Sequence, residues 1–111
     1  MSQNKTRGGP ARRAYDPTIF KRVNSHLLAD MDYFCGKYGG DGYIRGGEYI
    51  VRNPTRIDKS PGSFRINMKT GRWADFATGD RGGDPISYYA YVFGLSQIDA
   101  ARELAADLGV E

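Results

Sequence analysis

The chain has 111 residues, 40% of them hydrophobic and 26% charged, with a formal net charge of +3 at pH 7. This length predicts one small domain that can bury a modest core without a metal or a disulfide. One cysteine, Cys35, and one histidine, His26, exclude an intramolecular disulfide and supply too few ligands for a Cys/His zinc site. No apolar run approaches the roughly 18 residues of a membrane span. The polar, basic start lacks a secretory signal, so we expect no membrane association and a cytoplasmic location.

Charge is distributed unevenly along the chain. Residues 1–25 hold six basic residues and one acid, residues 43–83 hold eight and four, and residues 84–111 hold one and five. This asymmetry favours one cationic face and an anionic partner. Residues 1–14 are basic and lack the apolar side chains that offset the entropy of ordering. We therefore predict a disordered basic arm over residues 1–14, followed by a single domain over residues 15–111.

The first predicted element is an amphipathic helix over residues 17–35. Asp16-Pro17 has the form of an N-cap followed by proline at the first helical position. Apolar residues then recur at helical spacing, and glycines from Gly36 onward end the pattern. The predicted apolar stripe consists of Phe20, Val23, Leu27, Met31 and Phe34.

Two β-hairpins are predicted in the middle of the chain. The first covers residues 43–52 and turns at Gly46-Gly47, and the second covers residues 64–77 and turns at Thr70-Gly71. Between them, proline-containing turns bound a basic loop from Thr55 to Lys59.

The second hairpin predicts two faces of opposite character. If Thr70 and Gly71 form a two-residue loop, Met68 pairs with Trp73, and cross-strand partners share a face. The predicted core face holds Phe64, Ile66, Met68, Trp73, Asp75 and Ala77. The other face is cationic with one aromatic ring, a composition typical of sheets that bind nucleic acid, and holds Arg65, Asn67, Lys69, Arg72, Ala74 and Phe76.

The last third predicts two helices. Asp84-Pro85 repeats the cap-and-proline start, and Gly94 ends this helix near residue 93. Ser96 caps the final helix and Gly109 closes it. The predicted fold class is α+β: an antiparallel sheet of three to five strands with one N-terminal and two C-terminal helices, and no metal.

Catalytic motifs are lacking, so we predict no catalytic residue, no cofactor and no metal. Asp80 and Asp84 are carboxylates of the kind that hold Mg²⁺, which leaves a metal-dependent enzyme as an alternative. Asp84 also fits a helix cap, however, and Asp80 a turn. Gly82-Gly83 could cradle a phosphate, but Asp84 would repel it, so we interpret these glycines as a tight turn.

Basic and aromatic residues are the stronger signal. Arginine and lysine neutralise phosphates, and exposed aromatic rings stack on unpaired bases. The predicted nucleic-acid-binding residues are Arg45, Arg52, Arg56, Lys59, Arg65, Lys69, Arg72, Trp73, Phe76 and Arg81. The aromatic rings could instead belong to the core, which is the more common role for a tryptophan such as Trp73.

Several short motifs resemble the N-terminal zinc-ribbon (CHC-type) domain of bacterial, phage and plasmid DNA primases and primase-helicases. Residues 61–66 are similar to its serine-phenylalanine strand, and Trp73 to Gly79 to its Cys-x-x-Cys turn. The sequence from Gly82 to Ser87 is similar to its Gly-Gly-Asp helix start, and Gly94-Leu95-Ser96 opens a similar final helix. The resemblance extends from about Glu48 to Val110.

The zinc ligands of that family are missing. Asp75 and Thr78 stand where the paired cysteines would fall, and no Cys or His occurs between Arg52 and Ile57, where the upstream pair would fall. The resemblance thus implies the fold without the metal. Asp75 lies on the predicted core face, where a bare carboxylate is costly unless it is satisfied. We predict that it accepts hydrogen bonds from the Thr78–Gly83 turn or pairs with Arg52 or Arg56, and that Thr78 adds a hydroxyl.

The resemblance also implies a template-binding surface at Arg65, Lys69, Arg72 and Trp73. We expect a non-catalytic module that binds nucleic acid, single-stranded DNA first of all, in replication or priming of a mobile element or prophage. A primase or helicase protein is a further expected partner. The alternative is a protein-interaction module that docks a replication protein through its acidic C-terminal helices.

Overall fold

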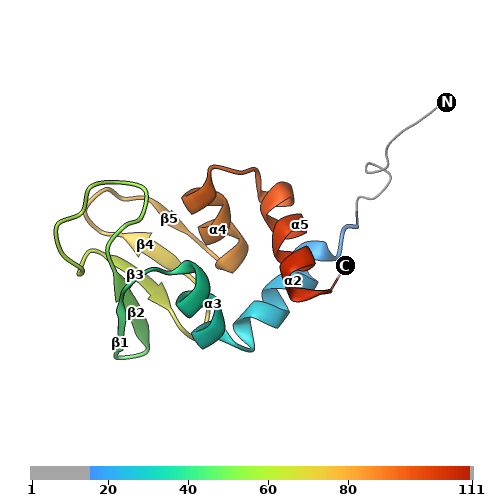
Figure 1. The fold of residues 1–111 in the computed structure, drawn as a ribbon, viewed down its shortest axis with the longest axis horizontal. Coiled ribbons are helices and arrows are strands. Elements are labelled where there is room, and N and C mark those ends of the chain that lie inside the picture. Colours follow the sequence, from blue (N-terminus) through green and yellow to red (C-terminus); the bar gives the residue numbers. More distant parts are fainter. Residues whose placement is uncertain (1–15, 111) are drawn as a thin grey trace.

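The computed structural model describes residues 16–110 and contains, in this part of the chain, four helices and five strands (Figure 1). The predicted α+β class is confirmed, with one more N-terminal helix than predicted. The predicted arm, residues 1–14, lies outside the described residues. The helices are α2 (Ile19–Leu28), α3 (Met31–Tyr38), α4 (Pro85–Phe93) and α5 (Gln97–Leu108). The strands are β1 (Tyr43–Arg45), β2 (Glu48–Val51), β3 (Phe64–Asn67), β4 (Trp73–Asp75) and β5 (Arg81–Gly82).

The predicted single helix over residues 17–35 is wrong, because two helices occupy this segment. α2 ends at Leu28 and α3 begins at Met31. Asp30 separates them: its carboxylate accepts a hydrogen bond from the Tyr33 N–H at 3.2 Å and caps α3. An aspartate that bonds the backbone in this way favours a helix start over a helix interior.

Both ends of this helical segment also differ from the prediction. Asp16 accepts hydrogen bonds from the N–H and the hydroxyl of Thr18, so the first helix begins at Ile19. Gly36 lies inside α3, which ends at Tyr38.

The strands form one antiparallel sheet in chain order, from β1 to β5. The predicted hairpin around Gly46-Gly47 is confirmed as β1 and β2. Both glycines have positive φ, 60° and 78°, as a two-residue turn of type I′ requires.

The second hairpin, β3 and β4, has a different register from the predicted one. Ile66 pairs with Trp73, where a two-residue loop would place Met68. The Asn67 N–H donates to the Arg72 carbonyl at 2.7 Å, so the loop comprises the four residues 68–71.

The Asn67 side chain explains the longer loop, because its carbonyl oxygen accepts hydrogen bonds from the N–H groups of Lys69 and Thr70, both at 2.9 Å. The shift is two residues, and strand side chains alternate with a period of two, so both predicted faces survive. Ala77 is exposed beyond the strand, and Met68 is half-buried in the loop. The residues of the predicted core face that are buried are Phe64, Ile66, Trp73 and Asp75.

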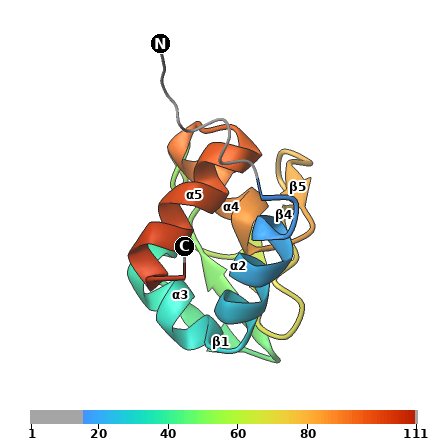
Figure 2. The ribbon, with the colours of Figure 1, turned by 90° about the vertical axis from the view of Figure 1, so that its right-hand side faces the viewer.

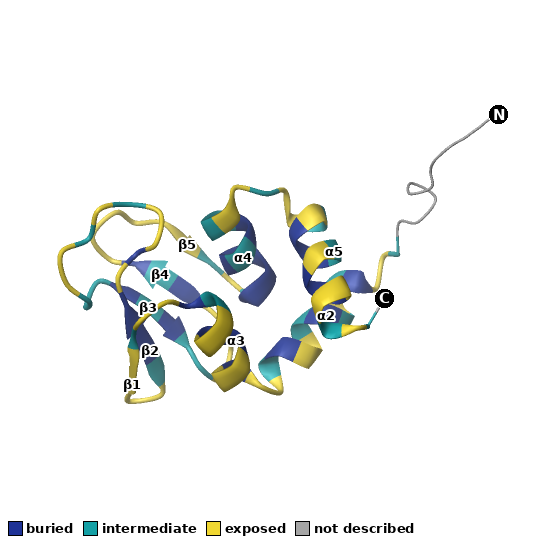
Figure 3. Ribbon diagram, in the orientation of Figure 1, coloured by how far each residue is buried: buried dark blue, intermediate teal, exposed yellow. Residues whose placement is uncertain are grey.

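The core extends from the inner face of the sheet through α4 to α2 and α5. α4 lies between the sheet and α5, and α2 packs against both α4 and α5 (Figures 1 and 2). Buried residues follow the same path (Figure 3). The predicted start of α4 is confirmed: Asp84 and Ser87 form a reciprocal capping box, and Pro85 occupies the first turn. This packing covers one face of the sheet. On the other face Ile50 is also buried, whereas the remaining side chains are half-buried or exposed.

Candidate nucleic-acid interface and the Asp75 cluster

The outer face of the sheet, the side turned away from the core helices, is defined by two cross-strand rows of side chains. Strand pairing fixes these rows, because directly opposed residues point to the same side. One row comprises Tyr43, Ile50, Arg65, Ala74 and Arg81. The other comprises Arg45, Glu48, Asn67 and Arg72. Four arginines from four different strands or their ends therefore share this face.

Most of these arginines have no carboxylate partner in the part of the chain that the structure describes. Arg65 pairs with Glu48 at 3.2 Å and donates to the Gly62 carbonyl at 3.0 Å. Among residues 16–110, no ion pair involves Arg45, Arg72 or Arg81. Within the described part of the chain, these three charges therefore have no carboxylate partner, an arrangement that suits contacts with phosphate.

An exposed aromatic ring lies beside these charges. Phe76 directly follows β4 and is 72% exposed. Its N–H donates to the Ser63 carbonyl at 2.8 Å, which continues the sheet by one residue and fixes the backbone there. A large apolar side chain with so little burial contributes little to the core, so its ring is available to a partner.

Two hollows open on either side of the middle of β4. The Ala74 hollow, about 180 Å³, is lined among others by Ala74, Phe76, Arg65 and Arg72. The β5 groove, about 600 Å³, is lined by residues 72–74 and 81–83, which include Arg72 and Arg81. Arg72 and Ala74 line both, so the two hollows adjoin.

Trp73 lines both hollows, but its side chain is buried, which does not support its predicted role in stacking on a base. It is 5% exposed, and its indole N–H donates to the Ser87 hydroxyl at 2.9 Å. The ring stacks on Phe64 and covers Gly82, where an added Cβ would lie 2.4 Å from the indole nitrogen. A tryptophan held in this way has no free face for a base.

Arg56 also lies away from the two rows, because its guanidinium pairs with the buried Asp75 carboxylate at 2.9 Å. The remaining predicted basic residues, Arg52, Lys59 and Lys69, are exposed. They lie in the loops at the ends of the sheet, after β2, before β3 and between β3 and β4, and so flank the outer face without belonging to its two rows.

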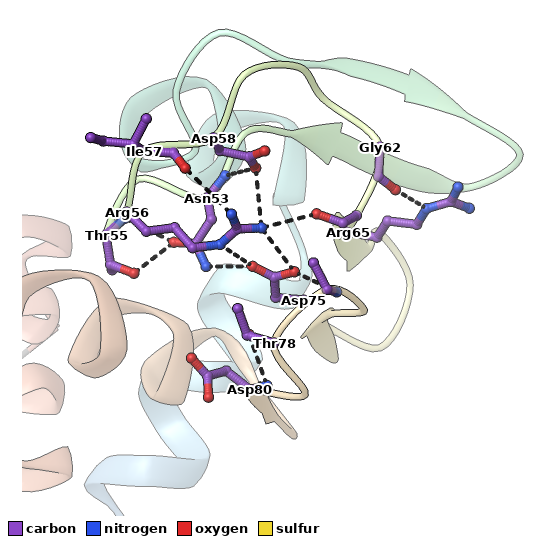
Figure 4. Close-up of polar contacts among 12 residues, drawn as sticks. Asn53, Thr55, Arg56, Ile57, Asp58, Gly62, Arg65, Asp75, Thr78 and Asp80 are labelled. Atoms are coloured by element: carbon purple, nitrogen blue, oxygen red, sulfur yellow. Dashed lines mark hydrogen bonds and ion pairs between the residues drawn. The ribbon is translucent and has the colours of Figure 1, made fainter.

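The Asp75 cluster fastens the long loop over residues 52–63 to the end of β4 (Figure 4). Asp75 has no exposed surface. Its carboxylate accepts hydrogen bonds from Arg56 Nε at 2.9 Å, Asn53 Nδ2 at 2.8 Å and the Ala77 N–H at 2.8 Å. Both carboxylate oxygens are thus satisfied, as a buried charge requires.

A second layer of contacts joins this cluster to α4. Asn53, which is 2% exposed, also donates to the Tyr91 hydroxyl at 2.9 Å. Its side-chain oxygen accepts from the Thr55 N–H and hydroxyl at 2.8 and 2.7 Å. Tyr91 in turn donates to Asp80 at 2.7 Å. The loop, the β4–β5 turn and α4 are therefore held by one connected network.

The sequence predicted only some of the contacts in this network. The predicted pairing of Asp75 with Arg56 is what the structure contains, whereas Thr78 accepts from the Asp80 N–H at 3.2 Å and bonds Asp75 only through the backbone. Asn53 was missed because Asn-Pro is a common turn signal. Tyr91 was missed because helical spacing favours packing for tyrosine.

Hydrogen bonding controls the ionisation of Asp75. Burial alone would raise its pKa, but the bonds from Arg56, Asn53 and the Ala77 N–H outweigh burial and hold the pKa well below the ordinary 3.8. A carboxylate whose pKa is lowered by folding stabilises the folded state fully above its unfolded pKa. That contribution is lost as pH falls towards the folded value.

We expect unfolding experiments from neutral pH to about pH 2 to show a loss of stability that begins below about pH 4. Asp75→Asn, which cannot ionise, should lose less stability over the same range. Equal losses in both proteins would place the acid sensitivity in other carboxylates, such as Asp16, whose pKa is lowered to about 2 by hydrogen bonds from Thr18 and Arg22.

Residues 16–110 contain no group of three or more His, Cys, Asp or Glu side chains placed to hold a metal ion. Asp84 caps α4 and Asp80 accepts from Tyr91, so both carboxylates of the enzyme alternative bind groups of the protein. None of the helices in this part of the chain is long and apolar enough to cross a membrane.

The fold and site together define a small α+β domain with a cationic outer sheet face and a polar cluster at the end of β4. No protein-family model matches the chain, and a search of curated proteins finds no relative.

Proposed function

We propose that this domain binds single-stranded nucleic acid, DNA first of all, on the outer face of its sheet, and that it does so without catalysis. The observation that supports this most is the combination of Arg45, Arg72 and Arg81, which form no ion pair with a described residue, with the exposed ring of Phe76. Phosphate contacts supply affinity, and ring stacking selects unpaired bases over duplex.

We further propose that the domain is a metal-free relative of the primase zinc ribbon and serves replication or priming of a mobile element or prophage. Two supports come from the Asp75 cluster. The cluster joins Asp75 to the segment over residues 52–57. Asp75 and this segment are the two places where the resemblance puts metal ligands. Asn53 and Arg56 also have the i, i+3 spacing of Asp75 and Thr78. A primase or helicase protein is its proposed partner.

A second candidate function is docking of a replication protein through the acidic C-terminal helices. Tyr33 and Phe93 are 41% and 50% exposed, near Asp107 and Glu103 of α5. Exposed aromatic rings are common anchors in protein interfaces. However, Lys37 and Tyr38 already bind Asp107, so the charge of this one acid is balanced internally.

Titration of a labelled single-stranded oligonucleotide at low and moderate salt tests the first proposal. We expect binding at low salt, with affinity falling by roughly 0.7 log unit per log unit of salt for each contacted phosphate. A duplex of the same sequence should bind more weakly, because its bases are not free to stack. Absence of binding at low salt would reject the first proposal and leave docking as the better explanation.

A further inference from the structure

The Ala74 hollow exists because a small residue occupies the middle of a face built from large ones. Ala74 lies between Arg65 on β3 and Arg81 on β5 in the same cross-strand row. Along its own strand it lies between Arg72 and Phe76, whose side chains point to the same side. A single methyl group therefore forms the floor, and the larger neighbours enclose about 180 Å³ above it.

Two walls of the hollow suit a flat, unsaturated ring. Phe76 offers an exposed aromatic ring. Arg65 offers a guanidinium group whose position is fixed by its bonds to Gly62 and Glu48. Aromatic rings and guanidinium planes are the groups on which proteins stack unpaired bases, and fixing the arginine beforehand reduces the entropy lost on binding.

The hollow does not suit a phosphate. Glu48 lines it, and among residues 16–110 its carboxylate forms an ion pair with one arginine alone, Arg65, at 3.2 Å. The adjoining β5 groove has the opposite character, because Arg72 and Arg81 line it and none of its described lining residues is acidic. Since Arg72 borders both, a base in the hollow and its phosphate in the groove would be neighbours.

We infer that the Ala74 hollow is a slot for one unpaired nucleobase, stacked on Phe76, with the adjacent phosphate bound by Arg72 and Arg81. This inference rests on the proposed function and adds a subsite to it. It explains why an alanine occupies a position where a β-branched residue would favour the strand more.

Filling the slot tests the inference without altering any charge. Ala74→Leu should weaken binding of a single-stranded oligonucleotide about tenfold, the range expected for loss of one stacked base. Ala74→Ser is the matched control, because its side chain stays small, and it should bind as the unmodified protein does.

Phe76→Ala removes the aromatic ring on which the base would stack. Phe76 is 72% exposed, and this variant should also weaken binding about tenfold. Phe93→Ala removes an exposed aromatic ring on α4 and should leave binding unchanged.

An oligonucleotide of abasic sites separates bases from phosphates. The unmodified protein should bind it about tenfold more weakly than the normal oligonucleotide, and Ala74→Leu and Phe76→Ala should bind it as the unmodified protein does. If Ala74→Leu binds the normal oligonucleotide unchanged, while Phe76→Ala weakens its binding and reversal of Arg72 and Arg81 prevents it, the slot is refuted and the proposed function stands. If neither Ala74→Leu nor Phe76→Ala weakens binding, the slot and base stacking on Phe76 are both refuted, and only phosphate binding by the outer face remains. If the unmodified protein binds neither oligonucleotide at low salt, the slot and the proposed function are both refuted.

Discussion

Asp75→Ala should lower the thermal unfolding midpoint by more than about 10 °C. Asp75 is fully buried, and its removal leaves the Arg56 guanidinium and the Asn53 amide without their main acceptor. Removing one partner of a buried ion pair costs on the order of 3 kcal/mol, and each kcal/mol shifts the midpoint of a domain this size by about 4–8 °C. Differential scanning calorimetry or circular dichroism would measure the change.

Asp80→Ala is the matched control for Asp75→Ala. It removes a nearby but exposed carboxylate that accepts from Tyr91, and should cost about 1 kcal/mol or less. A double variant with Arg56→Ala should be less destabilised than the sum of the two single variants, because each substitution removes the same ion pair. A small effect of Asp75→Ala, equal to that of Asp80→Ala, would contradict a stabilising role for the cluster.

A chelator gives an independent test of the same idea. If hydrogen bonds and the ion pair at Asp75 alone hold the long loop to β4, added EDTA should leave the unfolding midpoint of the unmodified protein unchanged. A midpoint that falls in EDTA would show that a bound metal contributes to stability, and the polar cluster would then not be its replacement.

The way the Asp75 cluster is built shows how polar groups can perform a structural task that metals perform elsewhere. A loop of this length contributes few apolar side chains, so something must offset the entropy of ordering it. Here Asn53 and Arg56 supply donors and Asp75 supplies the acceptor. Asn53 and Asp75 are buried and Arg56 is half-buried, and hydrogen bonds removed from water in this way are stronger. The arrangement requires every member to be satisfied, which explains the connection onward to Tyr91.

The fold could be predicted from the sequence wherever a short-range rule decided it. Gly46-Gly47 forces a two-residue turn, and Asp84-Pro85 forces a helix start, so both elements are where they were predicted. The errors arose where a polar side chain accepts hydrogen bonds from backbone N–H groups and so changes the local structure. Asp30 divides the N-terminal helix, and Asn67 lengthens the second hairpin loop by bonding two N–H groups.

The candidate site could be predicted as a face but not as a set of contacts. Alternation along β3 and β4 placed Arg65, Arg72 and Phe76 together, and a register error of two residues could not change that. Alternation also placed Trp73 on the core face and Phe76 on the outer face, and their burial agrees with this, but it could not predict what Trp73 packs against. Trp73 is buried because Gly82, on a strand of only two residues, leaves room for its indole.

Of the substitutions proposed, reversal of two charges on the outer face should weaken binding of single-stranded DNA the most. Arg72→Glu combined with Arg81→Glu removes both arginines of the β5 groove and places two negative charges beside the phosphates. We expect affinity for single-stranded DNA at low salt to fall by about a hundredfold, because lost attraction and new repulsion add. Both side chains are exposed and form no ion pair among residues 16–110, so the unfolding midpoint should change little.

The salt dependence distinguishes loss of specific contacts from loss of overall charge. If Arg72 and Arg81 each contact one phosphate, the slope of log affinity against log salt should become shallower by about 1.4 in the double variant. The control, Lys21→Glu with Arg102→Glu, changes the net charge equally but acts on α2 and α5, which pack against each other and against α4, away from the sheet. It should retain the original slope and lose little affinity. If control and test variants weaken binding equally, the attraction is a property of the whole charged domain, and the outer face has no special role.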